Sequence, residues 1–296
     1  MWVFLAILGY LFFSIGNIID KLVLTKIKRA TEYALSVGVF GSLGLLFVFF
    51  GFVWPSEPII LLGILVGALY IFALIPYYKA IQLGQASRVA SFIGGLIPVV
   101  VLILTTLSGL ELLTTRQYFA FFLILGGSFL IFYHLPRGKK SKTSILWALL
   151  SATALGCFYF LSKFIFLETG FVSGFVIMRV GGILASVSLM FFPHVLSDIL
   201  KDYKNRRRET TKDKAFLVLL AQSLAAAGFV SVSYAVAIGK VALVNAMAGA
   251  QYVFLLILAV LLAKKFPQLK EQVGKEVVIQ KIIAIVIIIT GLILII

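Results

Sequence analysis

The sequence contains very few of the residues that metal sites and catalytic centres use. It has one cysteine, Cys157, and two histidines, His134 and His194, among 296 residues. A single cysteine excludes an intramolecular disulfide and a cysteine metal site. Each histidine stands where an apolar run ends, which favours an interfacial position over a ligating one. Since no serine–histidine pair and no nucleotide-binding loop is evident, we expect neither an enzyme nor a bound metal or cofactor.

Charged residues are scarce, and acidic ones especially so. Only 12% of the residues are charged, with 26 Lys and Arg against 11 Asp and Glu. Hydrophobic residues make up 62% of the chain and the mean hydropathy is +1.13. Soluble domains contain roughly 45–50% apolar residues, so we expect an integral membrane protein. The basic residues lie in short connections between apolar runs, which argues against nucleic acid as a partner.

Ten apolar runs are long enough to cross a bilayer as helices. The first has neither the basic start nor the small-residue cleavage site of a signal peptide, so we expect it to be retained. The runs cover residues 2–20, 33–53, 59–79, 88–107, 117–134, 144–164, 171–192, 215–237, 241–263 and 277–296.

The distribution of positive charge predicts how these runs are oriented. The odd-numbered connections hold 22 of the 26 Lys and Arg, whereas the even-numbered ones hold three. Because cytoplasmic loops carry the excess of Lys and Arg, the odd connections are expected in the cytoplasm and both termini outside. We expect the plasma (inner) membrane as the location.

The two halves of the chain resemble each other. The segment "YYKAIQLGQASRVASFIGG" (77–95) aligns with "YAVAIGKVALVNAMAG" (234–249), and "NIIDKLVL" (17–24) with "YFLSKFIF" (159–166). We therefore predict two domains, 1–138 and 139–296, with five spans each. An odd number of spans turns the second domain upside down, and inverted repeats are typical of transporters that bind substrate near the midplane. One chain supplies both halves, so a monomer suffices and a dimer is also compatible.

A family resemblance is found in the second part of each half. The segment "YYKAIQLGQASRVASFIGGLIPVVVLILTTLSGLELLTTRQYFAFFLILGGSFLIFY" resembles the EamA-type domain of the drug/metabolite transporter superfamily. In that pattern a helix with a proline (Pro98) leads to a turn with a glutamate (Glu111), and a further helix ends in a glycine (Gly127). The resemblance implies an all-α integral membrane protein of ten transmembrane helices, built as two inverted five-helix EamA-like repeats. The second half departs from the pattern, with Val253 in place of the proline and "KKFPQLKE" in place of the glutamate turn.

Polar residues within the spans are the candidates for substrate binding. Some of them share a helix face, as Tyr10, Asn17 and Lys21 do in the first span. Hydrogen bonds between helices, an interfacial aromatic belt and lysines that reach the headgroups are alternative roles. The candidates are Tyr10, Asn17, Lys21, Tyr70, Tyr77, Ser91, Tyr159, Arg179, Gln222, Tyr234, Asn245, Gln251 and Tyr252.

Arg179 lies in the middle of an apolar run, where a charge costs roughly 2.5–3.5 kcal/mol on insertion scales. It either bonds helix-end carbonyls or projects into a cavity and attracts a carboxylate or phosphate. No acidic residue is evident at its depth, and proton-driven export of cationic drugs generally needs one.

These features favour a secondary transporter that moves a small amino-acid-like or other anionic or zwitterionic solute by alternating access. The expected partners are that small molecule and the membrane lipids. A translocator of lipids or lipid-linked headgroups, or a drug exporter, is the alternative. A lipid translocator would have a cavity open sideways to the bilayer.

Overall fold

The chain is described here by a computed structural model, which covers residues 1–23, 37, 40–83, 86–132, 142–191, 212–262 and 275–295. Within these ranges the side chains of Lys21 and Ser91 lie outside the described part, and nothing is said of them. The described secondary structure consists of helices, with no strand among these residues. The predicted all-α class is confirmed.

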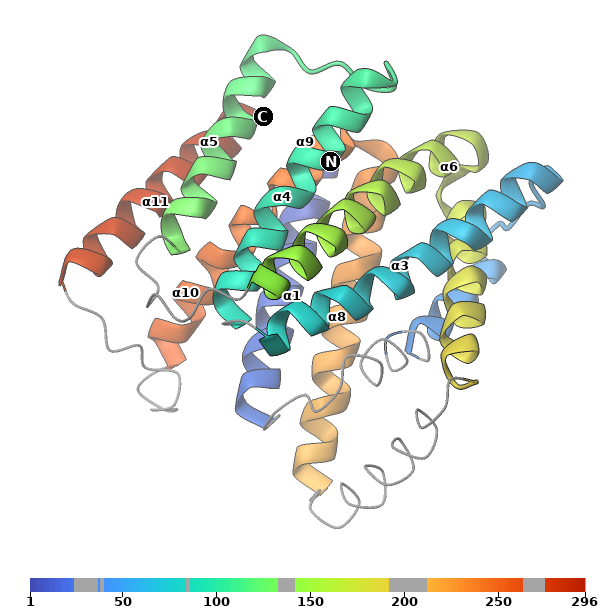
Figure 1. Cartoon of the computed structure of the whole chain (residues 1–296), viewed down its shortest axis with the longest axis horizontal. Coiled ribbons are helices and arrows are strands. Elements are labelled where there is room, and N and C mark those ends of the chain that lie inside the picture. The colour runs from blue at the N-terminus through green and yellow to red at the C-terminus, as the bar shows by residue number, and fades with distance from the viewer. Residues whose placement is uncertain are drawn as a thin grey trace.

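Nine α-helices and one 3₁₀ helix are found in this part of the chain. They are α1 (Trp2–Val23), η1 (Ser42–Phe49), α3 (Glu57–Leu83), α4 (Ala86–Leu107), α5 (Thr115–Phe132), α6 (Lys142–Leu189), α8 (Lys212–Ile238), α9 (Val241–Ala246), α10 (Gly249–Leu262) and α11 (Lys275–Ile295) (Figure 1).

Many large apolar side chains are exposed on the outside of these helices, among them Phe4, Leu61, Phe119 and Ile282. An apolar surface of this extent would be unfavourable in water and suits contact with lipid. Six helices in the described ranges are long and apolar enough to cross a membrane. The chain thus has the character of a multi-pass membrane protein.

Two apolar helical segments are interrupted. Gly170 divides α6 into a first part before it and a second part after it, because its backbone has φ 73° and ψ 171°. A positive φ is unfavourable for residues with a Cβ, and glycine adopts it freely. This break falls between the predicted runs 144–164 and 171–192. A second break, between α9 and α10, falls inside the predicted run 241–263. The run 33–53 lies partly outside the described residues, and its described part contains η1 rather than a regular α-helix.

Glycine allows direct backbone contact between α3 and the second part of α6. A Cβ placed on Gly67 would lie 1.9 Å from the carbonyl oxygen of Met178, and one on Gly181 would lie 2.0 Å from that of Ile64. Small residues allow this approach in membrane helices, where association depends on packing. Glycines likewise bring α1 against α8, since a Cβ on Gly228 would lie 2.9 Å from the carbonyl oxygen of Gly9.

The α4–α5 connection and both chain termini lie towards the same end of the molecule (Figure 1). The α8–α9 junction lies there as well, because a Cβ on Gly239 would come within 2.6 Å of the Trp2 ring. We call this the terminal end of the bundle. The other ends of α1, α5 and α10 point away from it (Figure 1).

The contact between α3 and α6 gives a direct test of the packing. Gly67→Ala should destabilise the protein by about 3 kcal/mol, because the added methyl group collides with backbone that cannot rotate away. Gly126→Ala is the control, since a Cβ at Gly126 meets nothing within 4 Å. Thermal unfolding in detergent measures both variants. Equal melting temperatures would contradict the close packing of α3 on α6.

Candidate substrate cavity and junction cluster

A cavity of about 360 Å³ opens between α1, residues 40–47, α3, the second part of α6, and α8. Its volume is in the range of small-molecule sites, roughly 300–1,000 Å³. The polar residues of its wall include Asn17, Arg179 and Gln222. Aromatic rings form much of the rest, namely Phe13, Phe40, Phe47, Tyr70, Tyr78, Phe175 and Phe229. The cavity therefore combines one cation with amides and a largely aromatic wall.

Arg179 lies between two aromatic rings of this wall. Its Cζ is 4.7 Å from the ring centroid of Phe175 and 4.0 Å from that of Phe229. These distances are those of cation–π contacts, which stabilise a guanidinium through the ring faces. Among the described residues the guanidinium makes no hydrogen bond or ion pair, although Tyr70 and Tyr159 line the same pocket. Its N–H donors thus have no hydrogen-bond partner among the described residues, and they face a cavity that a ligand could enter.

Two glycines let the arginine pack closely on the segment before α3. A Cβ on Gly41 would lie 3.2 Å from Nη1 of Arg179. A Cβ on Gly44 would lie 3.0 Å from Cγ of Arg179 and 3.0 Å from Cε1 of Phe175. A larger side chain at either position would therefore collide with the arginine or with Phe175. The small residues of this segment thus determine where the charged group lies.

The structure brings several sequence-predicted residues together. Asn17, Tyr70, Arg179 and Gln222 line the cavity. Tyr159 joins Tyr70 and Arg179 in a pocket of about 20 Å³ that shares part of the cavity wall. Among the predicted sites, these residues form the one constellation that faces a common space in the described part of the chain.

Other predicted residues lie elsewhere. Tyr234 lines a second groove of about 620 Å³, which adjoins the cavity at Phe47 and Val230, and its ring centroid is 4.9 Å from that of Phe171. The Tyr10 hydroxyl donates to the carbonyl of Val244 at 2.9 Å, which ties α1 to α9. Asn245 donates through Nδ2 to the carbonyl of Val241 at 2.9 Å, within its own helix.

The remaining candidates are also engaged with protein. The backbone carbonyl of Gln251 accepts a hydrogen bond from the Ser14 hydroxyl at 2.9 Å. Tyr252 lies against α4, where a Cβ on Gly94 would be 2.4 Å from its hydroxyl. Tyr77 packs edge-on against Tyr78 with centroids 5.0 Å apart. The contacts of Gln251 and Tyr252 lie between helices, as the packing alternative expects, whereas Tyr77 and Tyr78 are neighbours within α3.

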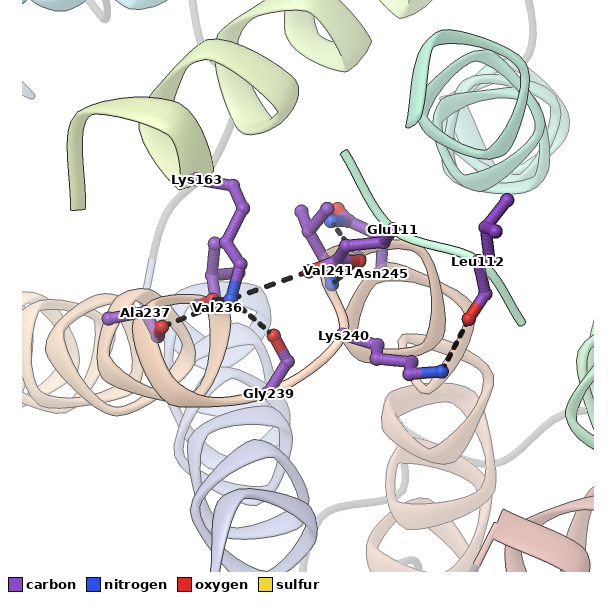
Figure 2. Close-up of polar contacts among 9 residues, drawn as sticks. All are labelled: Glu111, Leu112, Lys163, Val236, Ala237, Gly239, Lys240, Val241 and Asn245. Carbon is purple, nitrogen blue, oxygen red and sulfur yellow. Dashed lines mark hydrogen bonds and ion pairs between the residues drawn. The ribbon is translucent and has the colours of Figure 1, made fainter. Parts of the chain in front are cut away.

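A second polar cluster, at the terminal end, is built around the α8–α9 junction (Figure 2). Lys163, from the first part of α6, points its Nζ at the last carbonyls of α8. It donates to the carbonyls of Val236 at 3.2 Å, Ala237 at 3.1 Å and Gly239 at 2.7 Å. The last carbonyls of a helix have no partner within the helix and carry partial negative charge, so a buried lysine stabilises them.

Residues of the α4–α5 connection complete the cluster. Glu111 Oε1 lies 3.4 Å from Lys163 Nζ, and the two side chains are 9% and 7% exposed. Its Oε2 accepts the N–H of Val241, the first residue of α9, at 2.8 Å. Lys240 donates to the Leu112 carbonyl at 2.6 Å and to Gln117 Oε1 at 2.8 Å. We call Glu111, Lys163 and Lys240 the junction cluster (Figure 2).

The sequence contained only part of the signal for this cluster. It marked Glu111 as a turn glutamate, and it placed Lys163 only within the segment 159–166 that aligns with residues 17–24. Pairing between residues 52 positions apart depends on how the helices fold together. A lysine within an apolar span, with an aligned lysine in the other half, was the available clue.

The described side chains include no group of three His, Cys, Asp or Glu that could hold a metal ion. What the cavity offers is noncovalent binding, through one guanidinium, amide groups and ring faces.

Comparison with known proteins identifies the fold alone. No family model matches the chain, and no curated protein matches its sequence. A solved structure described only as "Crystal structure of protein" resembles it with a TM-score of 0.71 and 15% sequence identity. The match covers 99% of this chain and 97% of the other. The whole arrangement of helices is therefore shared with an experimentally determined protein.

The junction cluster predicts different effects of removing its two central charges. Lys163→Met should lower the free energy of unfolding by about 3–5 kcal/mol, because it leaves a buried carboxylate and three carbonyls without their donor. Glu111→Gln should cost only about 1 kcal/mol, since the amide oxygen still accepts the Val241 N–H. Burial raises the pKa of the Glu111 carboxyl, despite the nearby charge of Lys163, and a neutral group is accordingly tolerated there.

Thermal unfolding in detergent compares these variants, with Arg116→Met as a control because Arg116 is exposed at the start of α5. If Glu111→Gln destabilises the protein as much as Lys163→Met, the ion pair dominates and the capping of the α8 carbonyls is secondary.

Proposed function

We propose that the protein is a secondary transporter that moves a small anionic or zwitterionic metabolite across the membrane by alternating access. The observation that carries the proposal is Arg179, a cation in an apolar span with no hydrogen-bonding partner in the described part of the chain, in a cavity of about 360 Å³. A buried charge that serves only structure is normally paired. An unpaired one facing a cavity fits an anionic ligand.

In this proposal the chain has ten spans in two inverted five-helix repeats, residues 1–138 and 139–296, as in EamA-type transporters. Helix contacts support it. Exchanging each span for its counterpart replaces the contact of α1 with α8 by a contact of the first part of α6 with α3. Both are present, the second through hydrogen bonds from Ser144 and Ser151 to carbonyls of α3. The contact of α1 with α10 likewise becomes that of α6 with α4, also present. The contact between α5 and α11 joins two counterparts, so the exchange leaves it unchanged.

One helix contact has no equivalent in the described part of the other half of the chain. Such a difference between the halves is expected for alternating access. The second part of α6 packs directly on α3, with backbone contact at Gly67 and Gly181. The counterpart would bring η1 onto α8. Instead these two segments face each other across the cavity, with Leu43 and Phe47 on one side and Phe229 on the other. In inverted-repeat transporters each half takes up the conformation that the other half leaves when access alternates.

The junction cluster supports a role in closing the terminal end. It joins the α4–α5 connection of the first repeat to α6, α8 and α9 of the second through an ion pair and several hydrogen bonds. The cavity wall includes Asn17 and Gln222, which lie in the halves of α1 and α8 that are remote from the terminal end. With the orientation predicted from charge, this arrangement corresponds to a state open to the cytoplasm and closed to the outside.

Transport by purified protein in proteoliposomes tests the proposal. A panel of radiolabelled carboxylates and amino acids should include a solute that wild type moves and empty vesicles do not. Arg179→Ala should reduce its transport by about tenfold or more, because a charged hydrogen bond contributes about 1.5–3 kcal/mol. Arg116→Ala removes a positive charge outside the cavity and should transport normally. Equal activity of the two variants would refute Arg179 as the anchor.

Alternating access is tested by labelling a cysteine in the cavity. Cys157→Ala removes the single native cysteine, and Ala226→Cys places a thiol in the cavity wall. A membrane-impermeant maleimide should label it from the side of the basic connections. Adding Lys240→Met removes two hydrogen bonds of the junction cluster and should slow labelling from that side about fivefold, by shifting the population to the other state. Equal labelling from both sides, unchanged by Lys240→Met, would contradict the mechanism.

A lipid or lipid-linked headgroup translocator is the second candidate, and one observation favours it. The apolar groove of about 620 Å³ shares Phe47 and Val230 with the cavity wall. A tail could follow this groove while an anionic headgroup meets Arg179. Movement of fluorescent anionic lipid between leaflets of proteoliposomes, absent in Arg179→Ala, would favour this candidate over solute transport.

A further inference from the structure

We infer that the ligand of the cavity is an organic monoanion with an apolar body and no ammonium group, such as an aryl-substituted carboxylate. The inference rests on the proposed function and narrows its substrate class, because it separates simple anions from zwitterionic amino acids.

The charges of the cavity wall support a ligand of net charge −1. Arg179 is the one formally charged residue among the wall residues in the described part of the chain. Three carboxylates have described side chains, and none of them is in the wall. Glu57 begins α3, Glu111 belongs to the junction cluster and Glu168 is exposed just before Gly170.

An ammonium group would be poorly accommodated here. It would enter a low-dielectric site beside a guanidinium of the same sign, where repulsion is stronger than in water. Amide oxygens of Asn17 and Gln222 offer it only neutral acceptors. A dianion would also bind poorly, because no second cation among the described wall residues could pair with its second charge. Charge balance therefore selects one carboxylate or an equivalent singly charged group.

The contacts of Arg179 define how that group binds. Phe175 and Phe229 stabilise the guanidinium through their ring faces and hold its orientation. The in-plane N–H donors match the two oxygens of a carboxylate, which binds in a bidentate manner. The backbone at Gly41 lies close to the guanidinium, since a Cβ there would be 3.2 Å from Nη1, so the oxygens bind on the side of Arg179 that lines the cavity.

The remaining wall determines the body of the ligand. The pocket on the Tyr159 side has a volume of about 20 Å³, which holds about one water molecule and is too small for the body of a ligand. The body must therefore lie in the larger cavity, where Phe13, Phe40 and Phe47 provide aromatic surface. Aromatic pairs add about 0.5–1.5 kcal/mol beyond the area that they bury, so an aryl body suits this wall.

Two ligands that differ by one group test the inference. The dissociation constants of 3-phenylpropionate and L-phenylalanine are measured by isothermal titration calorimetry with the purified full-length protein in detergent. The two share a carboxylate and a phenyl ring, and phenylalanine adds the ammonium group. We expect 3-phenylpropionate to bind about tenfold or more tightly than phenylalanine. Equal or tighter binding of phenylalanine, or no binding of 3-phenylpropionate, would overturn the inference.

Variants of two cavity residues test where 3-phenylpropionate binds. Arg179→Gln should weaken 3-phenylpropionate by about tenfold or more, and Gly41→Val should weaken it because the added side chain displaces the guanidinium while its charge is kept. Arg116→Gln is the control and should bind like wild type. If Arg179→Gln does not fold, Gly41→Val alone decides, and unchanged affinity in that variant would contradict the assigned position.

The two proposals fail differently. If 3-phenylpropionate binds in an Arg179-dependent manner but proteoliposomes move no solute, the monoanion site stands and transport is wrong. If phenylalanine is the better ligand and is transported, transport stands and the exclusion of ammonium is wrong.

Discussion

Satisfying the backbone groups at the break between α8 and α9 is the constraint on which the arrangement of helices depends. Inside an apolar bundle, free helix-end carbonyls and N–H groups cost several kcal/mol each unless the protein supplies partners. Lys163 bonds three carbonyls at the end of α8, and Glu111 accepts the first N–H of α9. Because these side chains come from α6 and from the α4–α5 connection, satisfying the break fixes four segments relative to one another.

Two cations within the bundle are stabilised in contrasting ways. Lys163 has a carboxylate and three carbonyls, so its donors are fully used and its position is fixed. Arg179 has two ring faces and no described acceptor, so its charge is stabilised but its donors are open. The first arrangement is typical of structure and the second of recognition. A guanidinium suits the second role better, because it is weakly hydrated and stacks on aromatic faces.

The sequence predicted those features that depend on local composition. Apolar runs correctly predicted long apolar helices, and the gap between residues 164 and 171 coincides with the break at Gly170. The interruption between α9 and α10 and the 3₁₀ geometry of η1 were missed, because neither contains a proline or a polar run to mark it. The predicted ten spans and inverted repeats stay proposals.

The candidate site was predictable in part for the same physical reason. Arg179 stands out in any apolar run, whereas the role of Asn17 or Gln222 depends on which helix face the fold leaves open. Polar stripes also indicate hydrogen bonds between helices, and Tyr10 is of that kind. The pairing of Lys163 with Glu111 could be recognised only from the tertiary structure, because the sequence around each residue does not indicate its partner.

The glycines at positions 41 and 44 tie the position of the charged group to a second segment. The charge is supplied from α6, but a Cβ at Gly41 would lie 3.2 Å from Nη1 of Arg179 and one at Gly44 would lie 3.0 Å from its Cγ, closer than ordinary van der Waals contact. A larger residue at either position would therefore move the guanidinium or the segment packed on it. The place of this cation in the cavity can thus change through residues 41 and 44 while residue 179 itself stays the same.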